Sequence, residues 1–240
     1  LPALSSFLRF DSGGIANRIP PEDSVDNAAV SEIKLNKNAG SFVNAYIKKN
    51  GYFLGKMKKS LAAHFKIMDA VFDKQDMPVE LKYLAFVESG LKRNAGSRTG
   101  AVGPWAFMPV AAKQYGLKIS EAKDERLDYA KSTRAAAALL SDLYDKYGDW
   151  LMVIAAYNCG PGGIDKAIKK SGSRHYWVLQ NFLPEETRKH VKKFIAVHYY
   201  FEGHGSVVTL TKTERENYIK TLELHAAGQQ EKKDSAEVMR

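Results

Sequence analysis

Cysteine, long apolar runs and blocks of like charge are almost missing from this sequence. Cys159 is the only cysteine, so the chain cannot form an internal disulfide. The longest uncharged, apolar-rich run, residues 150–164, is too short and too rich in glycine to span a bilayer. No internal repeat occurs, and no alternation of strand and helix patterns indicates a parallel sheet. These absences leave a mainly helical chain, long enough for a substantial core.

Metal-binding and cofactor-binding patterns are missing as well. The six histidines show no HExxH spacing, and His198 with Glu202 offers only two ligands on one helix face. We therefore expect no metal and no cofactor. Cys159 could act as a nucleophile only with a histidine beside it, and His175, His190 and His198 are all distant in sequence. A small buried thiol is the expected role of this cysteine.

Acidic residues are outnumbered, and the formal net charge is +9. A basic surface favours a polyanionic partner such as nucleic acid, an anionic membrane or an acidic cell-wall polymer. The lysines and arginines are scattered and match no nucleic-acid motif, so we do not expect nucleic acid. We expect helices over residues 41–49 and 52–74, with a break at Gly51. The second helix carries four lysines, which form either a solvated face or a contact for an anionic polymer: Lys56, Lys58, Lys59 and Lys66.

One helix with an acidic residue on its apolar face is the most informative stretch. Pro78 suits the first helical position, Leu81 and Leu84 recur at helix spacing, and Glu88 is the next residue on that face before Gly90 can end the helix. A carboxylate in an apolar setting tends to keep its proton near neutral pH. A protonated carboxylic acid there is what a general acid requires.

Two alternatives for Glu88 remain open from the helix alone. The side chain could turn toward solvent, or it could pair with Lys82, Lys92 or Arg93. A glycosidase ordinarily needs a second carboxylate. The segment 92–122 contains only Glu121. Either the second carboxylate comes from outside this segment, or the reaction needs only one. The candidates outside the segment are Asp124, Glu125 and Asp128.

Two further stretches carry candidate binding residues. Residues 92–104 contain three glycines, which let a backbone approach a ligand closely, and Trp105, Phe107 and Met108 follow with aromatic and apolar surface. Stacking on sugars and packing in the core both remain open for these rings. Tyr157 and Asn158 end a helix that is apolar all round, where they could orient a carbohydrate or simply pack and cap.

Taken together, these motifs resemble the catalytic SLT domain of the family 1 lytic transglycosylases, and within it the membrane-bound lytic murein transglycosylase D group. The resemblance covers residues 41–203. It rests on Glu88-Ser89, the serine-glycine loop 97–103, the segments 105–109 (WAFMP) and 156–162 (AYNCGPG), and the stretches that begin at Asp124, Lys131, Tyr147 and Leu183.

The resemblance implies a mainly α fold, a lysozyme-like helical domain with an N-terminal helical arm. We expect a partly irregular arm over residues 1–40, the transglycosylase domain over 41–224 and a polar, frayed tail over 225–240. Within the domain, residues 204–224 could form a short extended piece and a last helix. It also implies cleavage of the β-1,4 bond between N-acetylmuramic acid and N-acetylglucosamine in peptidoglycan. Glu88 would serve as the single acid and base, and a 1,6-anhydro product would form without water.

The resemblance further implies a set of substrate-binding residues. These are Ser89, Ser97, Trp105, Phe107, Met108, Tyr157 and Asn158. Ala106 and Leu139 stand where the family usually has glutamine and often has tyrosine, and Pro104 replaces a leucine. Such losses keep two alternatives open: a weak or inactive peptidoglycan-binding protein of the same fold, and a lysozyme-type hydrolase.

Location follows from the same resemblance. We expect the bacterial cell envelope, periplasmic or associated with the outer membrane, with peptidoglycan strands as the partner. The chain begins with leucine and shows no signal peptide, so we expect that an N-terminal segment has been removed. Such a segment would offer a route to peripheral membrane association.

Overall fold

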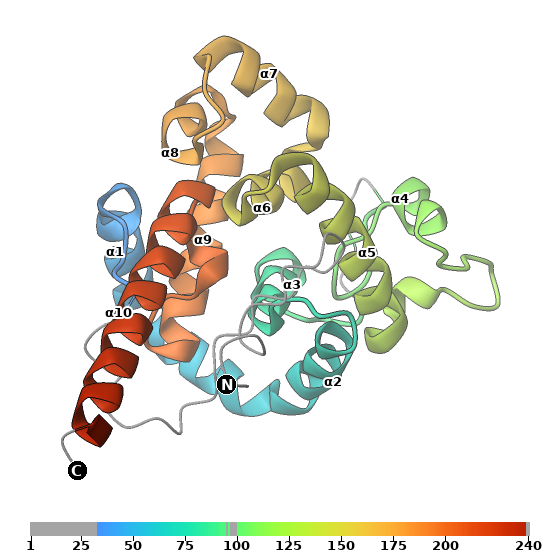
Figure 1. Ribbon diagram of the computed structural model, residues 1–240. Coiled ribbons are helices and arrows are strands. Elements are labelled where there is room, and N and C mark those ends of the chain that lie inside the picture. The colour runs from blue at the N-terminus through green and yellow to red at the C-terminus, as the bar shows by residue number, and fades with distance from the viewer. Residues whose placement is uncertain (1–32, 95, 97–99, 239–240) are drawn as a thin grey trace.

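The computed structural model describes residues 33–94, 96 and 100–238, with side chains described as far as residue 228 (Figure 1). Over these residues the backbone forms helices and isolated bridges but no strand, which confirms the mainly α expectation. The α-helices are α1 Lys37–Ser60, α2 Ala62–Asp73, α3 Lys82–Ser89, α4 Pro109–Gln114, α5 Tyr129–Tyr147, α6 Trp150–Cys159, α7 Pro161–Ser171, α8 Tyr176–Leu179, α9 Glu185–Glu202 and α10 Lys212–Val238. Short 3-10 turns are η2 Val79–Leu81, η3 Glu125–Leu127, η4 Gln180–Phe182 and η5 Val207–Thr209.

Helix α6 lies at the centre of the domain, against α5, α7 and α9 (Figure 1). Every residue from 150 to 156 is buried, as an all-round apolar helix requires. Asp149 caps this helix, accepting from the Met152 N–H at 3.1 Å. Its other oxygen accepts from the Lys212 N–H at 2.8 Å, which joins the start of α10 to the core helix.

Most helix ends follow local signals in the sequence. The Asp128 side chain accepts from the Lys131 N–H at 2.8 Å and begins α5. Gly90 and Gly148 end α3 and α5 at a φ of +64°, a left-handed conformation that glycine adopts without steric cost. Gly203 ends α9 in the same way, at a φ of +84°.

The predicted break at Gly51 is wrong. Residues 41–49 and 52–74 were expected to form separate helices, but α1 continues through Gly51 and the chain breaks at Leu61. The reason is tertiary packing against α9. The Tyr200 hydroxyl donates to the Gly51 carbonyl at 2.8 Å, and it lies 2.8 Å from where a Cβ on Gly55 would stand. Glycine serves close approach here and does not end the helix.

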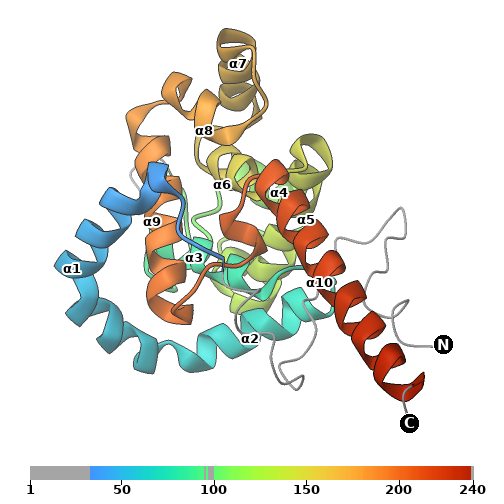
Figure 2. The ribbon, with the colours of Figure 1, turned by 60° about the vertical axis from the view of Figure 1, so that its left-hand side comes forward.

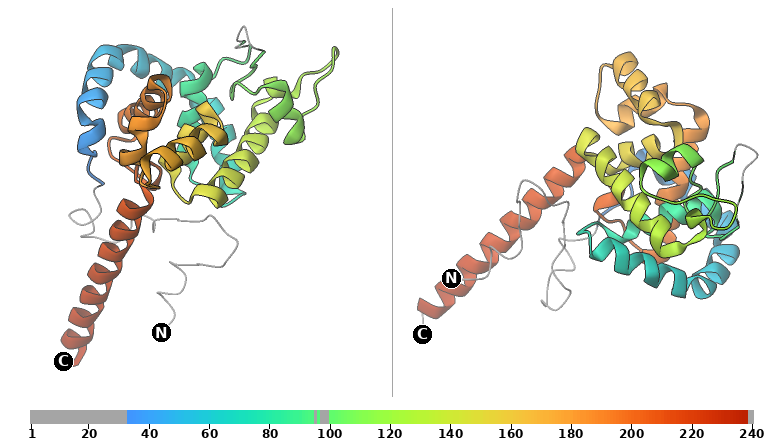
Figure 3. Two further views of the ribbon diagram at one scale, coloured as in Figure 1. Left: turned by 90° about the horizontal axis from the view of Figure 1, so that it is seen from above. Right: turned by 90° about the vertical axis from the view of Figure 1, so that its right-hand side faces the viewer.

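Two expectations for the C-terminal part also need correction. The segment after Gly203 forms the 3-10 turn η5, not an extended piece. The tail over 225–240 does not fray from its start, because α10 continues as one helix to Val238 with no proline to stop it. Figures 2 and 3 show α10 projecting away from the domain. Of the predicted arm over 1–40, residues 1–32 lie outside the described residues.

Candidate active site

Glu88 lies in the last turn of α3, on the face that the sequence predicts to be buried. Leu81, Leu84 and Ala85 on that face are fully buried, and the Glu88 side chain is 15% exposed. The predicted alternative partners do not reach it. Lys82 pairs instead with Asp69 at 2.8 Å. For the described residues, no lysine or arginine nitrogen lies within 4.0 Å of the Glu88 carboxyl.

The partner that Glu88 does have is His190 on α9. His190 Nε2 lies 2.8 Å from Glu88 Oε1, and the two side chains are 10% and 15% exposed. Neither atom has a hydrogen-bond partner of good geometry among the described residues, so the contact is short but not linear. The sequence had suggested His190 only as a distant partner for Cys159. The available clue was its place on the buried stripe of α9 with Thr187, Val191 and Phe194.

Tyr157 and Asn158 join the end of α6 to the rest of the site. The Tyr157 hydroxyl donates to the Trp105 carbonyl at 2.6 Å. Burial, and secondarily the charge of Glu88, raise the pKa of Tyr157 well above its ordinary value. Asn158 Oδ1 accepts from Thr187 Oγ1 at 2.8 Å, one turn before His190 on α9.

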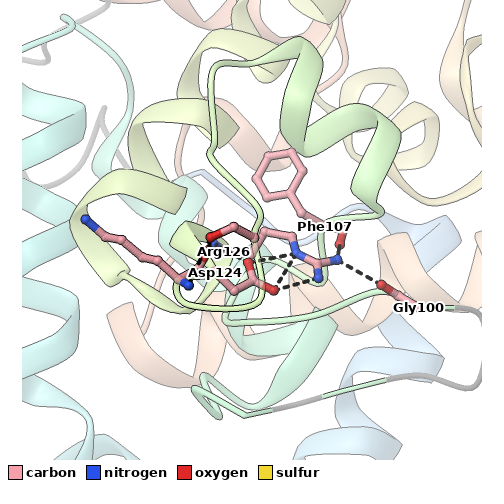
Figure 4. A network of polar contacts seen from close by, with 6 residues as sticks. Gly100, Phe107, Asp124 and Arg126 are labelled. Carbon is pink, nitrogen blue, oxygen red and sulfur yellow. Dashed lines mark hydrogen bonds and ion pairs between the residues drawn. The ribbon is translucent and has the colours of Figure 1, made fainter.

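A buried arginine holds the loop that follows α3. Arg126 donates to the carbonyls of Gly100 at 2.9 Å and Phe107 at 3.0 Å, and its fork grips the Asp124 carboxylate at 2.7 Å (Figure 4). These bonds lower the pKa of Asp124. Gly103 is required at its position, because a Cβ there would stand 2.1 Å from the Arg126 carbonyl oxygen.

The predicted substrate contacts divide into two groups. Trp105 and Phe107 are 0% and 2% exposed, so their rings pack in the core and cannot stack on sugars in this conformation. Trp105 Nε1 donates to Thr133 Oγ1 at 2.9 Å, which fixes the indole from inside. Met108 is 43% exposed and remains available to a ligand.

Of the two serines predicted to bind substrate, only Ser89 lies within the described residues. The Ser89 hydroxyl donates to the Pro104 carbonyl at 2.6 Å, so it ties α3 to the glycine-rich loop. Ser97 lies outside the described residues. Ala106 adopts a φ of +49°, a left-handed conformation uncommon for a residue with a Cβ.

The candidate second carboxylates are all engaged in structural contacts. Asp124 binds Arg126, and Asp128 caps α5. Glu125 pairs with Lys131 and accepts from the Lys118 N–H at 3.0 Å, and these contacts lower its pKa to about 2. Each carboxylate therefore already has a structural partner.

In the described part of the chain, no side-chain geometry supports Cys159 as a nucleophile or a bound metal ion. The Cys159 thiol is half-buried, burial raises its pKa, and no histidine lies within hydrogen-bond reach of it. No three histidine, cysteine, aspartate or glutamate side chains converge there as a ligand set.

The segment that contains Glu88 matches a known protein family. Residues 67–180, which include Glu88, Tyr157 and Asn158, match the family model of the transglycosylase SLT domain. This segment is a transglycosylase SLT domain. His190 lies beyond the matched residues, although it contacts Glu88 within them.

Relatives of the SLT domain include two named transglycosylases. The membrane-bound lytic murein transglycosylase D of Escherichia coli K12 is 40% identical over 129 residues, which is 52% of this chain and 28% of that protein. The peptidoglycan transglycosylase gp16 of Escherichia phage T7 is 30% identical over 119 residues, 49% of this chain and 9% of that protein. The chain thus spans well under half the length of these relatives.

Solved structures share the fold of the SLT domain. The 70-kDa soluble lytic transglycosylase SLT70 of Escherichia coli aligns with a TM-score of 0.54 at 23% identity, over 62% of this chain and 26% of that chain. The complex of the 70-kDa soluble lytic transglycosylase with bulgecin A aligns with a TM-score of 0.56 at 19% identity, over 77% and 33%. These likenesses confirm the expected lysozyme-like helical fold. Among the described helices, none is both long and apolar enough to cross a bilayer.

Proposed function

We propose that this chain is a lytic transglycosylase that cleaves the β-1,4 bond between N-acetylmuramic acid and N-acetylglucosamine in peptidoglycan, with Glu88 as its single acid and base. The main support is the position of Glu88, a largely buried carboxyl of the SLT domain that has no lysine or arginine partner among the described residues. The next residue, Ser89, joins its helix to the glycine-rich loop. The names of the two transglycosylase relatives point to the same polymer. The site of action is then the bacterial envelope.

The reaction needs one carboxyl because the substrate supplies its own nucleophile. Glu88 donates its proton to the glycosidic oxygen as the bond from that oxygen to C1 of the muramoyl residue breaks. The C6 hydroxyl of the same residue then attacks C1, and its proton passes to the Glu88 carboxylate. A 1,6-anhydro ring forms, no water is consumed, and Glu88 ends protonated as it began.

The surrounding residues are proposed to hold the glycan and the loop. Met108 presents an exposed thioether beside the site, and Tyr157 and Asn158 fix the end of α6 against the loop and α9. Ser89 and Ser97 are proposed to position the glycine-rich loop and the sugar. Trp105 and Phe107 support that loop from within the core.

Mass spectrometry of digested peptidoglycan tests this function. Wild type, Glu88→Gln and the exposed control Glu121→Gln are compared on purified sacculi. Muropeptides one water lighter than hydrolysis products, made by wild type and Glu121→Gln but not by Glu88→Gln, are the expected result. Full-mass reducing ends would establish a hydrolase instead.

Absence of any product would favour the remaining alternative, a peptidoglycan-binding protein of the same fold. In that case wild type should still bind sacculi. Ala106→Gln and Leu139→Tyr are then the first variants to assay for recovered turnover, since these positions have lost the side chains usual in the family. Peripheral membrane association through an upstream segment is measured separately, by the partition of the full-length cellular protein.

A further inference from the structure

The two oxygens of the Glu88 carboxyl have different surroundings. Oε1 is buried and faces His190 Nε2 at 2.8 Å. The exposed 15% of the side chain therefore belongs to its other atoms. A glycan approaching from solvent can meet Oε2 but not Oε1. Proton transfer is thus assigned to Oε2, while Oε1 contacts His190 on the buried side of the carboxyl.

His190 is fixed by packing and not by a second polar partner. Its side chain is 10% exposed, and its Nδ1 is buried without a hydrogen bond among the described residues. One turn earlier, Thr187 anchors the helix to Asn158 at 2.8 Å. The ring can therefore direct only Nε2 toward a partner, and that partner is Glu88.

We propose that His190 is the positioning residue of Glu88. Its Nε2–H donates to Oε1, keeps Oε2 turned toward the glycan and stabilises the carboxylate that exists between donating and regaining the proton. This inference rests on the proposed function. The contact is not linear without substrate, and hydrogen bonds of this kind tighten when substrate binds.

Few other ionisable groups face this pair. Tyr157 approaches from α6. Helix α1, which packs along α9, carries lysines and tyrosines but no carboxylate. On α9 itself, Glu186 and Lys193 lie one turn to either side of His190, and both are exposed to solvent. Within the described part of the chain, the contact between Glu88 and His190 is therefore little affected by other charges.

Two substitutions separate positioning from packing. His190→Phe removes the donor and should lower kcat roughly 100-fold with KM nearly unchanged. His190→Gln restores an N–H donor at this position, so it should recover part of the kcat that His190→Phe loses. The exposed His204→Gln serves as the matched control and should change nothing.

The proposal is overturned if His190→Phe keeps kcat, or if His190→Gln is no more active than His190→Phe. An inactive wild type would refute the proposed function instead. The contact itself is then still measurable, because NMR signals of the His190 ring nitrogens should shift between wild type and Glu88→Gln. Unchanged signals would refute the pairing.

A second and independent observation concerns the outer face of α1, defined by Lys48, Lys49, Tyr52, Lys56 and Lys59. Helix α1 forms an outer edge of the domain, with its inner side against α9 (Figure 2). All five residues are exposed, and Tyr52 is 90% exposed. The helix contains no aspartate or glutamate. In the described part of the chain, none of these four lysines lies within 4.0 Å of a carboxylate oxygen.

The shape and chemistry of this face favour a flat anionic partner. Phe53, 53% exposed, adds a second aromatic ring beside it and contacts Phe86 on α3, with ring centroids 6.5 Å apart. A single convex helix cannot enclose a sugar chain, but it can lie on a flat surface. Exposed aromatic rings among lysines are typical of segments that bind anionic bilayer surfaces. We infer that the α1 face docks on an anionic lipid membrane.

Co-sedimentation with vesicles tests this docking. The full chain should bind vesicles that contain phosphatidylglycerol and not phosphatidylcholine alone, and salt should weaken the binding. Each lysine of the α1 face changed to glutamine should reduce the partition about fivefold. The matched control changes four exposed lysines elsewhere to glutamine: Lys166, Lys169, Lys170 and Lys193.

Tyr52→Ser should also weaken binding, since the phenol would leave the bilayer interface. Equal losses in the control variant would mean that overall charge alone drives binding, and would overturn the inference. So would failure of wild type to bind the anionic vesicles. A requirement for the four lysines in sacculus binding but not in vesicle binding would identify the face as a glycan contact instead.

Discussion

Replacing Arg126 with lysine should loosen the loop that carries the site. The guanidinium donates to the carbonyls of Gly100 and Phe107 at 2.9 and 3.0 Å, and it holds Asp124 through two further nitrogens (Figure 4). Its side chain is 7% exposed. A lysine keeps the charge but has a single nitrogen, which cannot reach the carboxylate and both carbonyls at once.

The expected cost follows from the bonds that lysine cannot make. Two backbone carbonyls lose a charged donor, and each such bond contributes about 1.5 kcal/mol or more. The free energy of unfolding should therefore fall by about 3 kcal/mol. For a chain of this size the midpoint of thermal unfolding should drop by roughly 6–12 °C.

Calorimetry on wild type, Arg126→Lys and Arg174→Lys measures this effect. Arg174 is the matched control, because its guanidinium donates to one exposed carbonyl, that of Lys146 at 2.9 Å. Its replacement should shift the midpoint by no more than about 2 °C. Turnover of Arg126→Lys should fall at temperatures below its unfolding, since Ser89, next to Glu88, is hydrogen-bonded to this loop at Pro104. A midpoint for Arg126→Lys as close to wild type as that of the control would refute the reasoning.

Three further predictions concern single contacts. Gly103→Ala should lower the free energy of unfolding by about 3 kcal/mol or more in urea, because its Cβ would clash with the Arg126 carbonyl. Gly100 has a φ of +89°, but no described atom lies within 4 Å of where its Cβ would stand, so Gly100→Ala should cost only about 1–2 kcal/mol of left-handed strain. Equal losses in the two variants would contradict the predicted clash at Gly103. Tyr157→Phe loses the bond to the Trp105 carbonyl and should cost about 1–2 kcal/mol, and no loss would mean that the bond contributes nothing. Burial lowers the pKa of His198 to about 3, and its Nε2 lies 2.8 Å from Ser206 Oγ. Histidine in the unfolded chain binds a proton below about pH 6.5, whereas folded His198 stays neutral until about pH 3. The free energy of unfolding is therefore highest above pH 6.5 and falls as the pH is lowered toward 3, by about 2 kcal/mol at pH 5. Urea unfolding at pH 7 and pH 5 should show that loss in wild type but not in His198→Gln.

Local chemistry explains why much of the fold could be predicted from the sequence. Asp128 and Gly148 bound α5 through a side-chain cap and a left-handed glycine, which act within one turn of the chain. Helix periodicity alone placed Glu88 on the buried face of α3. The order of the motifs indicated the SLT domain, which the family model confirms for residues 67–180.

Contacts between segments far apart in the sequence could not be predicted from local sequence patterns. The break at Gly51 was wrong because Tyr200 uses that glycine for close packing. Trp105 had two open roles in the sequence, and only the packing of the domain over it decided that its ring is buried.

The sequence by itself determined most helix ends, the SLT domain and the position of Glu88 on the buried face of its helix. Each depends on residues within a few turns of one another or on the order of motifs along the chain. The tertiary structure alone decided which side chain lies against Glu88. His190 meets Glu88 because α9 packs across α3, and no spacing in the sequence encodes that distance. Asp124, Glu125 and Asp128, by contrast, have their structural partners within six residues along the chain.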